Sequence, residues 1–229
     1  MLTPVRAAPG LAGVVFDLDG TLVDSCDDIA SAANHCLEQA GFTPRSTAEI
    51  RTFIGDGARL LLARAAVLEP ADERLDRLLE HFQVYYTAHA VEQTRLLPGA
   101  REVLRALAHL PRALCTNKPR ATTLAMLRAL DIDGELDVVV AAGDVPHHKP
   151  HPAPLERVGE LLGLSPQQLV LVGDGPQDIE CAKAAGARSI GISEAIIVPL
   201  ARLRAATPDA IVPLAEVPAL ISRWQAGVA

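Results

Sequence analysis

The stretch Val14-Val15-Phe16-Asp17-Leu18-Asp19-Gly20-Thr21 decides the fold, because an apolar run ends there abruptly at two aspartates and a glycine. The run is short, β-branched and aromatic, and it lacks the alternation of a half-exposed strand. This pattern is typical of a strand buried on both faces, as in parallel sheets that are covered by helices. The sequence therefore predicts a buried strand with polar groups at its carboxyl end.

Beyond Pro98, short apolar runs alternate with segments whose leucines and alanines recur at helical spacing. The predicted strands are residues 113–116, 138–141, 169–172, 189–192 and 210–212. Such alternation is typical of a parallel sheet that is covered by helices on both faces. The predicted fold class is therefore α/β, with a doubly wound parallel sheet.

The segment between the first strand and Pro98 has helical patterns throughout and no strand signal. An all-helical block that is inserted after the first strand is expected to form a cap domain. We therefore predict a core domain of residues 1–23 and 97–229, and a helical cap of residues 24–96.

Charge and composition argue against several classes of function. Of the 229 residues, 21 are Lys or Arg and 28 are Asp or Glu, so the formal net charge is −7. A net acidic chain is poorly suited to grip nucleic acid phosphates. An aromatic content of 3% does not favour a base-stacking surface either. We therefore expect no nucleic acid partner.

The chain shows no pattern for export, membrane insertion or a disulfide scaffold. Residues 1–13 do not form a convincing signal peptide, and no uncharged apolar stretch reaches the ~18 residues of a membrane helix. The four cysteines are spaced neither for a zinc site nor for a small disulfide framework. We expect reduced thiols, a cytoplasmic location and no membrane partner.

Polar side chains follow four of the predicted strands, namely Asp17, Asp19, Thr116, Lys149, Asp174 and Asp178. Ligands of an open parallel sheet bind beyond the carboxyl ends of the strands, so these side chains are expected to converge. Four carboxylates repel one another unless cations compensate, and one lysine cannot balance them alone. Mg²⁺ can do so, because it takes oxygen ligands and often sits beside substrate phosphate. Gly20 permits a tight turn whose amides can point at phosphoryl oxygens.

These residues resemble, in the same order along the chain, the four motifs of the haloacid dehalogenase superfamily. The motifs are Asp17-Leu18-Asp19-Gly20-Thr21-Leu22, then Thr116, then Lys149, then Gly173-Asp174-Gly175-Pro176-Gln177-Asp178. The helical insert resembles the cap that many members carry after the first strand. The resemblance implies a Rossmann-like core and a phosphatase.

The resemblance also implies a role for each catalytic position. Asp17 would be the nucleophile that forms an aspartyl-phosphate. Asp19 would protonate the leaving oxygen and then activate water. Thr116 would hydrogen-bond a phosphoryl oxygen, and Lys149 would hold Asp17 and neutralise transition-state charge. Carbon–halogen cleavage needs no acid, so Asp19 favours phosphoryl transfer to water.

The implied cofactor is Mg²⁺, although Mn²⁺ suits the same oxygen ligands. Its ligands would be the Asp17 carboxylate, the Asp19 backbone carbonyl and the Asp174 carboxylate. Asp178 would act on a metal-bound water or on Lys149.

Several stretches are similar to phosphoglycolate phosphatases in particular: Val15–Ser25, Ile54–Ala58, Thr116–Pro119 and Lys149–Pro152. Arg59 is the expected partner of a second anionic group on the substrate, and Asn117 and Gly20 are further expected substrate contacts. The chain departs from many relatives at Gly175-Pro176 and in the segment Ser193–Ile197.

The function predicted from the sequence is Mg²⁺-dependent hydrolysis of a small phosphate ester, such as 2-phosphoglycolate, by a monomer or homodimer. A phosphosugar mutase of the same superfamily would use the same catalytic residues and return the phosphoryl group to the substrate. A phospho-accepting signalling domain of the receiver type would also combine aspartates, a threonine, a lysine and Mg²⁺ on a parallel sheet.

Overall fold

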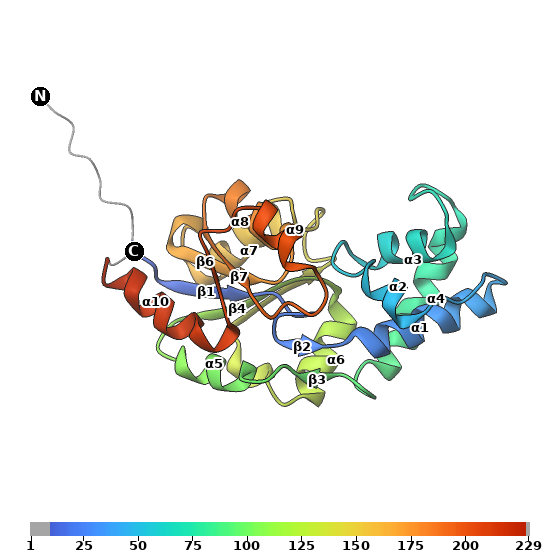
Figure 1. Ribbon diagram of the computed structural model, residues 1–229, viewed down its shortest axis with the longest axis horizontal. Helices are drawn as coiled ribbons and strands as arrows, with labels where there is room; N and C mark the ends of the chain where they lie inside the picture. Colours follow the sequence, from blue (N-terminus) through green and yellow to red (C-terminus); the bar gives the residue numbers. More distant parts are fainter. Residues whose placement is uncertain (1–9, 228–229) are drawn as a thin grey trace, which may run out of the picture.

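The computed structural model describes residues 10–227, and its centre is a six-stranded parallel sheet (Figure 1). The strands lie in the order β5 (Val138–Ala142), β4 (Arg112–Pro119), β1 (Gly13–Phe16), β6 (Leu169–Gly173), β7 (Arg188–Ile192) and β8 (Ala210–Val212). All four residues of β1 are buried, as the unbroken apolar run predicts. The predicted doubly wound parallel sheet is confirmed.

Helices cover both faces of the sheet, because successive side chains of a strand point to opposite faces. Val14 and Phe16 belong to the cluster that includes α5 (Ala100–Ala106), α6 (Arg120–Ala129) and α10 (Val217–Gln225). Val15 belongs to the opposite cluster, with α7 (Ala153–Leu162) and α8 (Pro176–Ala185). The remaining core elements are α9 (Leu200–Ala205) and the 3₁₀ turns Asp133–Glu135, Pro166–Gln168 and Leu214–Glu216.

The segment that the sequence assigns to the cap lies to one side of the sheet (Figure 1). It contains α1 (Cys26–Gln39), α2 (Thr47–Arg51), α3 (Ala58–Ala66) and α4 (Arg74–His89). The short helix α2 was not predicted, although a capping box between Ser46 and Glu49 starts it.

Two short strands join the cap to the sheet, which corrects the expectation of a purely helical insert. Strand β2 (Val23–Asp24) pairs antiparallel with β3 (Arg95–Leu96). The buried carboxylate of Asp28 accepts hydrogen bonds from the Gln93 and Thr94 amides, just before β3. The predicted domain boundaries fall within this two-stranded ribbon, and the division into two domains stays a prediction.

The structure extends β4 by three residues beyond the predicted Thr116, so Asn117 and Lys118 are part of the strand. All four cysteines are buried, and none of them forms a disulfide bond in this structure. No helix within residues 10–227 is long and apolar enough to cross a membrane. The expectation about a signal peptide falls mostly on residues 1–9, which lie outside the described residues.

Candidate active site

Asp17 begins the loop that follows β1, and a buried lysine holds its carboxylate. The backbone amide of Asp17 donates to the Val172 carbonyl at 2.9 Å, which fixes the start of the loop against β6. Lys149 Nζ lies 2.9 Å from Asp17 Oδ1 and 2.6 Å from Asp178 Oδ1, and it donates to the Cys115 carbonyl at 2.6 Å. Burial alone would lower the pKa of Lys149, but Asp17 and Asp178 outweigh it and hold this pKa well above its ordinary value.

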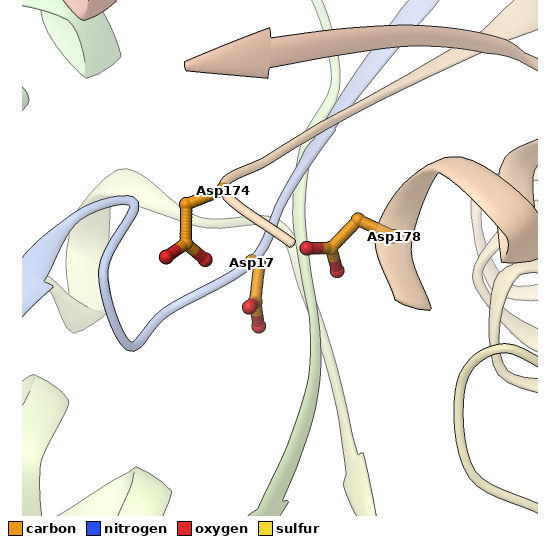
Figure 2. Close-up of side chains that lie close together, drawn as sticks. All are labelled: Asp17, Asp174 and Asp178. Atoms are coloured by element: carbon orange, nitrogen blue, oxygen red, sulfur yellow. The ribbon is translucent and has the colours of Figure 1, made fainter. Parts of the chain in front are cut away.

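Three carboxylates converge beside this lysine, as Figure 2 shows for Asp17, Asp174 and Asp178. One oxygen from each lies within 4.8 Å of the others, and all three residues are buried. Asp178 uses both oxygens, because Oδ1 accepts from Lys149 and Oδ2 accepts from the Gly175 amide at 3.1 Å. Its position therefore favours the expected action on Lys149.

Asp174 differs from Asp178, because its Oδ2 is buried and has no hydrogen-bond partner among the described residues. Burial raises the pKa of Asp17 to about 6 and the pKa of Asp174 well above its ordinary value. The charged forms of both groups thus need more positive charge than Lys149 supplies. A divalent cation with oxygen ligands fits this pair of carboxylates.

Gly20 shapes the loop around the Asp174 carboxylate. Its φ is +83°, and a Cβ atom at this position would overlap the Asp174 carboxylate. The Gly20 amide donates to the Val23 carbonyl at 2.8 Å, so it is already engaged. Within the described part of the chain, the preceding amides of Leu18 and Asp19 form no hydrogen bond, which leaves them for phosphoryl oxygens.

The carboxylate of Asp19 is held by two side chains, Lys118 and Ser25, that the sequence does not assign to the site. Lys118 Nζ lies 2.8 Å from Oδ1 and 3.0 Å from Oδ2 of Asp19, and it donates to the Tyr86 hydroxyl at 2.6 Å. The Ser25 hydroxyl donates to Asp19 Oδ1 at 2.5 Å instead of capping α1. Lys118 directly follows the motif residues Thr116 and Asn117, which was the available signal, whereas Tyr86 reaches the site only through the packing of α4.

Thr116 and Asn117 lie at the end of β4, as expected. Thr116 lines the cavity above Asp17. The Asn117 side chain donates to the carbonyls of Gly55 and Lys149, at 3.0 and 2.9 Å, and accepts from the Lys149 amide at 2.9 Å. Asn117 therefore links the cap loop, which contains Gly55, to the loop that contains Lys149. Its side-chain amide is occupied by these contacts and is not left for substrate.

Arg59 is the one predicted site residue that the structure does not bring to the site. Its Nη1 lies 2.6 Å from Asp76 Oδ1, and its Nε donates to the Pro70 carbonyl. Its side chain is 38% exposed and does not line the cavity beside Asp17. The Asp76 carboxylate, 17 residues along the chain, takes its guanidinium in this structure, and a contact between Arg59 and the substrate stays a prediction.

A small cavity of about 50 Å³ lies between the sheet edge and the cap. Its polar floor consists of Asp17, Asp19, Thr116, Lys118 and Asp174. Its cap side is apolar, with Ile29, Leu61 and Phe82 near Tyr86. The arrangement offers a carboxylate nucleophile, a cation-binding pair and a second carboxylate around one cavity.

Comparisons with known proteins identify the family. Residues 14–192 match the model of the haloacid dehalogenase-like hydrolases. The chain belongs to this family. The phosphoglycolate phosphatase of Shigella boydii is 39% identical over 205 residues, which covers 80% of this chain and 81% of the relative. The family resemblance drawn from the four motifs is thus confirmed.

Solved structures agree with this family membership. A predicted phosphoglycolate phosphatase from Haemophilus somnus has a TM-score of 0.82 and 31% identity, with 92% of this chain and 97% of that chain covered. A β-phosphoglucomutase from Clostridium difficile has a TM-score of 0.76 at 19% identity over 95% and 98% of the two chains, which shows the shared fold alone. The expected enzyme class, a phosphatase of the haloacid dehalogenase-like family, is confirmed by these relatives.

Proposed function

We propose that this enzyme hydrolyses 2-phosphoglycolate, or a closely similar small phosphate ester, through a phosphoryl group carried on Asp17. The observation that carries the proposal is the position of Asp17 between Lys149, 2.9 Å away, and the unpartnered carboxylate oxygen of Asp174. A buried carboxylate with a cation on one side and a cation-binding carboxylate on the other is suited to attack phosphorus.

Asp17 and Asp174 would hold Mg²⁺ through their carboxylates, together with the Asp19 backbone carbonyl. When bound, the ion supplies positive charge to the phosphoryl oxygens and lowers the repulsion between them and Asp17. Asp174 Oδ2 supports this assignment, because it has no hydrogen-bond partner within residues 10–227. Asp178 would position Lys149, since both of its oxygens already accept hydrogen bonds.

The proposed first half of the reaction gives each of these side chains one role. Asp17 attacks phosphorus, and the bond between phosphorus and the ester oxygen breaks. Asp19 gives its proton to that oxygen, which leaves as a hydroxyl group of the alcohol and not as an alkoxide. The Thr116 hydroxyl and the Leu18 and Asp19 amides donate to the phosphoryl oxygens, and Lys149 offsets their charge.

The second half reverses the role of Asp19. A water molecule attacks phosphorus, and Asp19 takes one of its protons. The bond between phosphorus and Asp17 breaks, which restores the Asp17 carboxylate and releases inorganic phosphate. A cap that closes over the substrate would exclude other water and other acceptors. The hydrogen bond from Asn117 to the Gly55 carbonyl joins the cap segment to β4.

Two features support a small substrate. The cavity beside Asp19 is small, with a volume of about 50 Å³. The curated relatives at 38–39% identity are named phosphoglycolate phosphatases. Both features favour a compact alcohol such as glycolate over the sugar phosphate that a phosphosugar mutase would bind.

The test is phosphate release with Mg²⁺ from a panel of esters that includes 2-phosphoglycolate and hexose phosphates. We expect the highest kcat/KM with 2-phosphoglycolate and loss of turnover on removal of the metal with a chelator. An isomerised sugar phosphate with little free phosphate would indicate the mutase instead. A phosphoryl group that stays on the protein without turnover would indicate the signalling alternative.

A further inference from the structure

We infer that Lys118 recognises the carboxylate on the alcohol part of the substrate and thereby determines specificity. This inference rests on the proposed function, since it assigns a partner to the group that the reaction releases. It replaces the role that the sequence had suggested for Arg59.

Lys118 is the cation that faces the leaving-group side of the cavity. It lies at the end of β4, and its side chain is only 2% exposed. Among the described residues that line the cavity, no other side chain is a lysine or an arginine. Lys149 lies behind the floor and contacts Asp17 and Asp178, so it serves the phosphoryl end.

The contacts of Lys118 place it beside the ester oxygen. Asp19 must touch that oxygen to protonate it, and Lys118 Nζ lies within 3.0 Å of both Asp19 carboxylate oxygens. In a 2-phosphoester of glycolate, one carbon separates the ester oxygen from the carboxyl carbon. The ester and carboxylate oxygens are then on the order of 3 Å apart by ordinary bond lengths. The substrate carboxylate thus comes within reach of the same ammonium group.

The ammonium group has three donors, and the structure shows where they point. They serve the two oxygens of Asp19 and the Tyr86 hydroxyl, and Nζ also lies 4.5 Å from the centroid of the Tyr86 ring. A substrate carboxylate takes over one donor from Asp19, which frees an Asp19 oxygen for the ester oxygen. The Tyr86 hydroxyl accepts from Lys118, and Tyr86 itself lines the cavity.

The other side chains that line the cap side of the cavity carry no charge. Ile29, Leu61 and Phe82 line it with apolar groups. A carboxylate that enters such a space loses water and needs a charged partner, whereas a neutral group does not gain from the ammonium. The cavity is therefore expected to discriminate between a carboxylate and a neutral group of equal size.

The experiment compares 2-phosphoglycolate with 2-phosphoglycolamide, in which an uncharged amide replaces the carboxylate at nearly the same size. For the wild type, we expect kcat/KM to favour the carboxylate by ~100-fold or more. In Lys118→Met, this ratio falls to about one, mainly through a higher KM for 2-phosphoglycolate. Lys118→Arg keeps the charge and retains part of the ratio. The substitution can also disturb Asp19 and so lower kcat/KM for both substrates. Such a common loss cancels in the ratio of the two kcat/KM values.

Lys183→Met serves as the control, because Lys183 Nζ donates to the Ala206 carbonyl away from the cavity. It is expected to keep the wild-type ratio. A wild-type ratio near one overturns the inference even if Lys118→Met does not fold. A wild-type ratio that persists in Lys118→Met also overturns it and assigns Lys118 to the positioning of Asp19. In both cases, phosphate release by the wild type leaves the proposed function standing; release from no ester refutes both.

Discussion

Lys149 Nζ lies 2.9 Å from Asp17 Oδ1, so the nucleophile is joined to a loop that is more than 130 residues away along the chain. The same ammonium contacts Asp178 at the start of α8. One buried cation thus fixes the positions of residues from three strand ends. This arrangement stabilises the attacking carboxylate, but it leaves Asp174 without a partner among the described residues.

Lys149 alone does not balance the charges of Asp17 and Asp174. The free energy of unfolding of the metal-free protein should therefore depend on pH. Burial raises the pKa of Asp17 to about 6, so the folded state binds more protons than the unfolded state between about pH 4 and 6. Stability contributed by this group is present below pH 4 and lost as the pH rises through 6. Relative to Asp17→Asn, the metal-free wild type should lose on the order of 3 kcal/mol across this range. Urea unfolding in a chelator at several pH values measures the difference.

Addition of metal should reverse this loss of stability. We expect Mg²⁺ to raise the Tm of the wild type on the order of 5 °C at pH 7.5 and much less at pH 5, where protons compete for the ligands. Asp174→Asn should reduce the shift. A stability difference between the wild type and Asp17→Asn that stays constant from pH 4 to 7.5 would contradict the account.

Gly20 and Gly41 offer a matched test of the loop around Asp174. Their φ values are +83° and +77°, but an added Cβ meets the Asp174 carboxylate only at Gly20 and finds open space at Gly41. Alanine at either position costs about 1–2 kcal/mol for the left-handed backbone. Gly20→Ala should cost about 1–3 kcal/mol more, because the Asp174 side chain must move.

The same pair tests metal binding. Gly20→Ala should raise the Mg²⁺ concentration for half-maximal activity by ~10-fold, since it displaces a ligand. Gly41→Ala should leave that concentration within about twofold of the wild type. Equal effects of the two substitutions on stability and on Mg²⁺ dependence would show that the loop does not depend on the approach of Gly20 to Asp174.

Asn117 is predicted to couple the cap to the catalytic lysine. Its side chain makes hydrogen bonds to Gly55 and to both backbone groups of Lys149. Asn117→Ala should lower the free energy of unfolding by about 2–3 kcal/mol and kcat by ~10-fold, because the cap loop and Lys149 both lose a restraint.

Asn34 provides the control for this effect. Its side chain makes two hydrogen bonds to the Arg45 backbone, within the cap and away from the cavity. Asn34→Ala should cost about 2 kcal/mol of stability and leave kcat within about twofold. If both variants lower kcat to the same extent, the loss reflects general destabilisation and not the link to Lys149.

The fold and the polar residues at the floor of the site could be predicted from the sequence, because the ends of the strands are visible in it. The apolar run before Asp17 and those before Thr116 and Asp174 are unbroken, so the ends of the strands can be read directly. Topology then brings these ends to one edge of the sheet. The carboxylates and Lys149 could therefore be predicted to meet without knowledge of the helices.

The cap side could not be predicted in the same way. The partner of Arg59 is Asp76 on another helix, and this pairing depends on how α3 and α4 pack. Tyr86 carries no signal in its local sequence, because only the position of α4 brings its hydroxyl to Lys118. The helix α2 was missed because its five residues are too few for a periodic pattern, even with a capping box at Ser46.

The most direct test of the central claim locates the phosphoryl group during turnover. The enzyme is mixed with Mg²⁺ and 2-phosphoglycolate, quenched in acid within milliseconds and reduced with borohydride, which converts an aspartyl-phosphate to homoserine. Mass spectrometry of the peptides then identifies the modified position. We predict homoserine at position 17 in the wild type and none in Asp17→Asn, which should also lose turnover by ~10⁴-fold or more. Homoserine at another position, or near wild-type turnover by Asp17→Asn, would contradict the account.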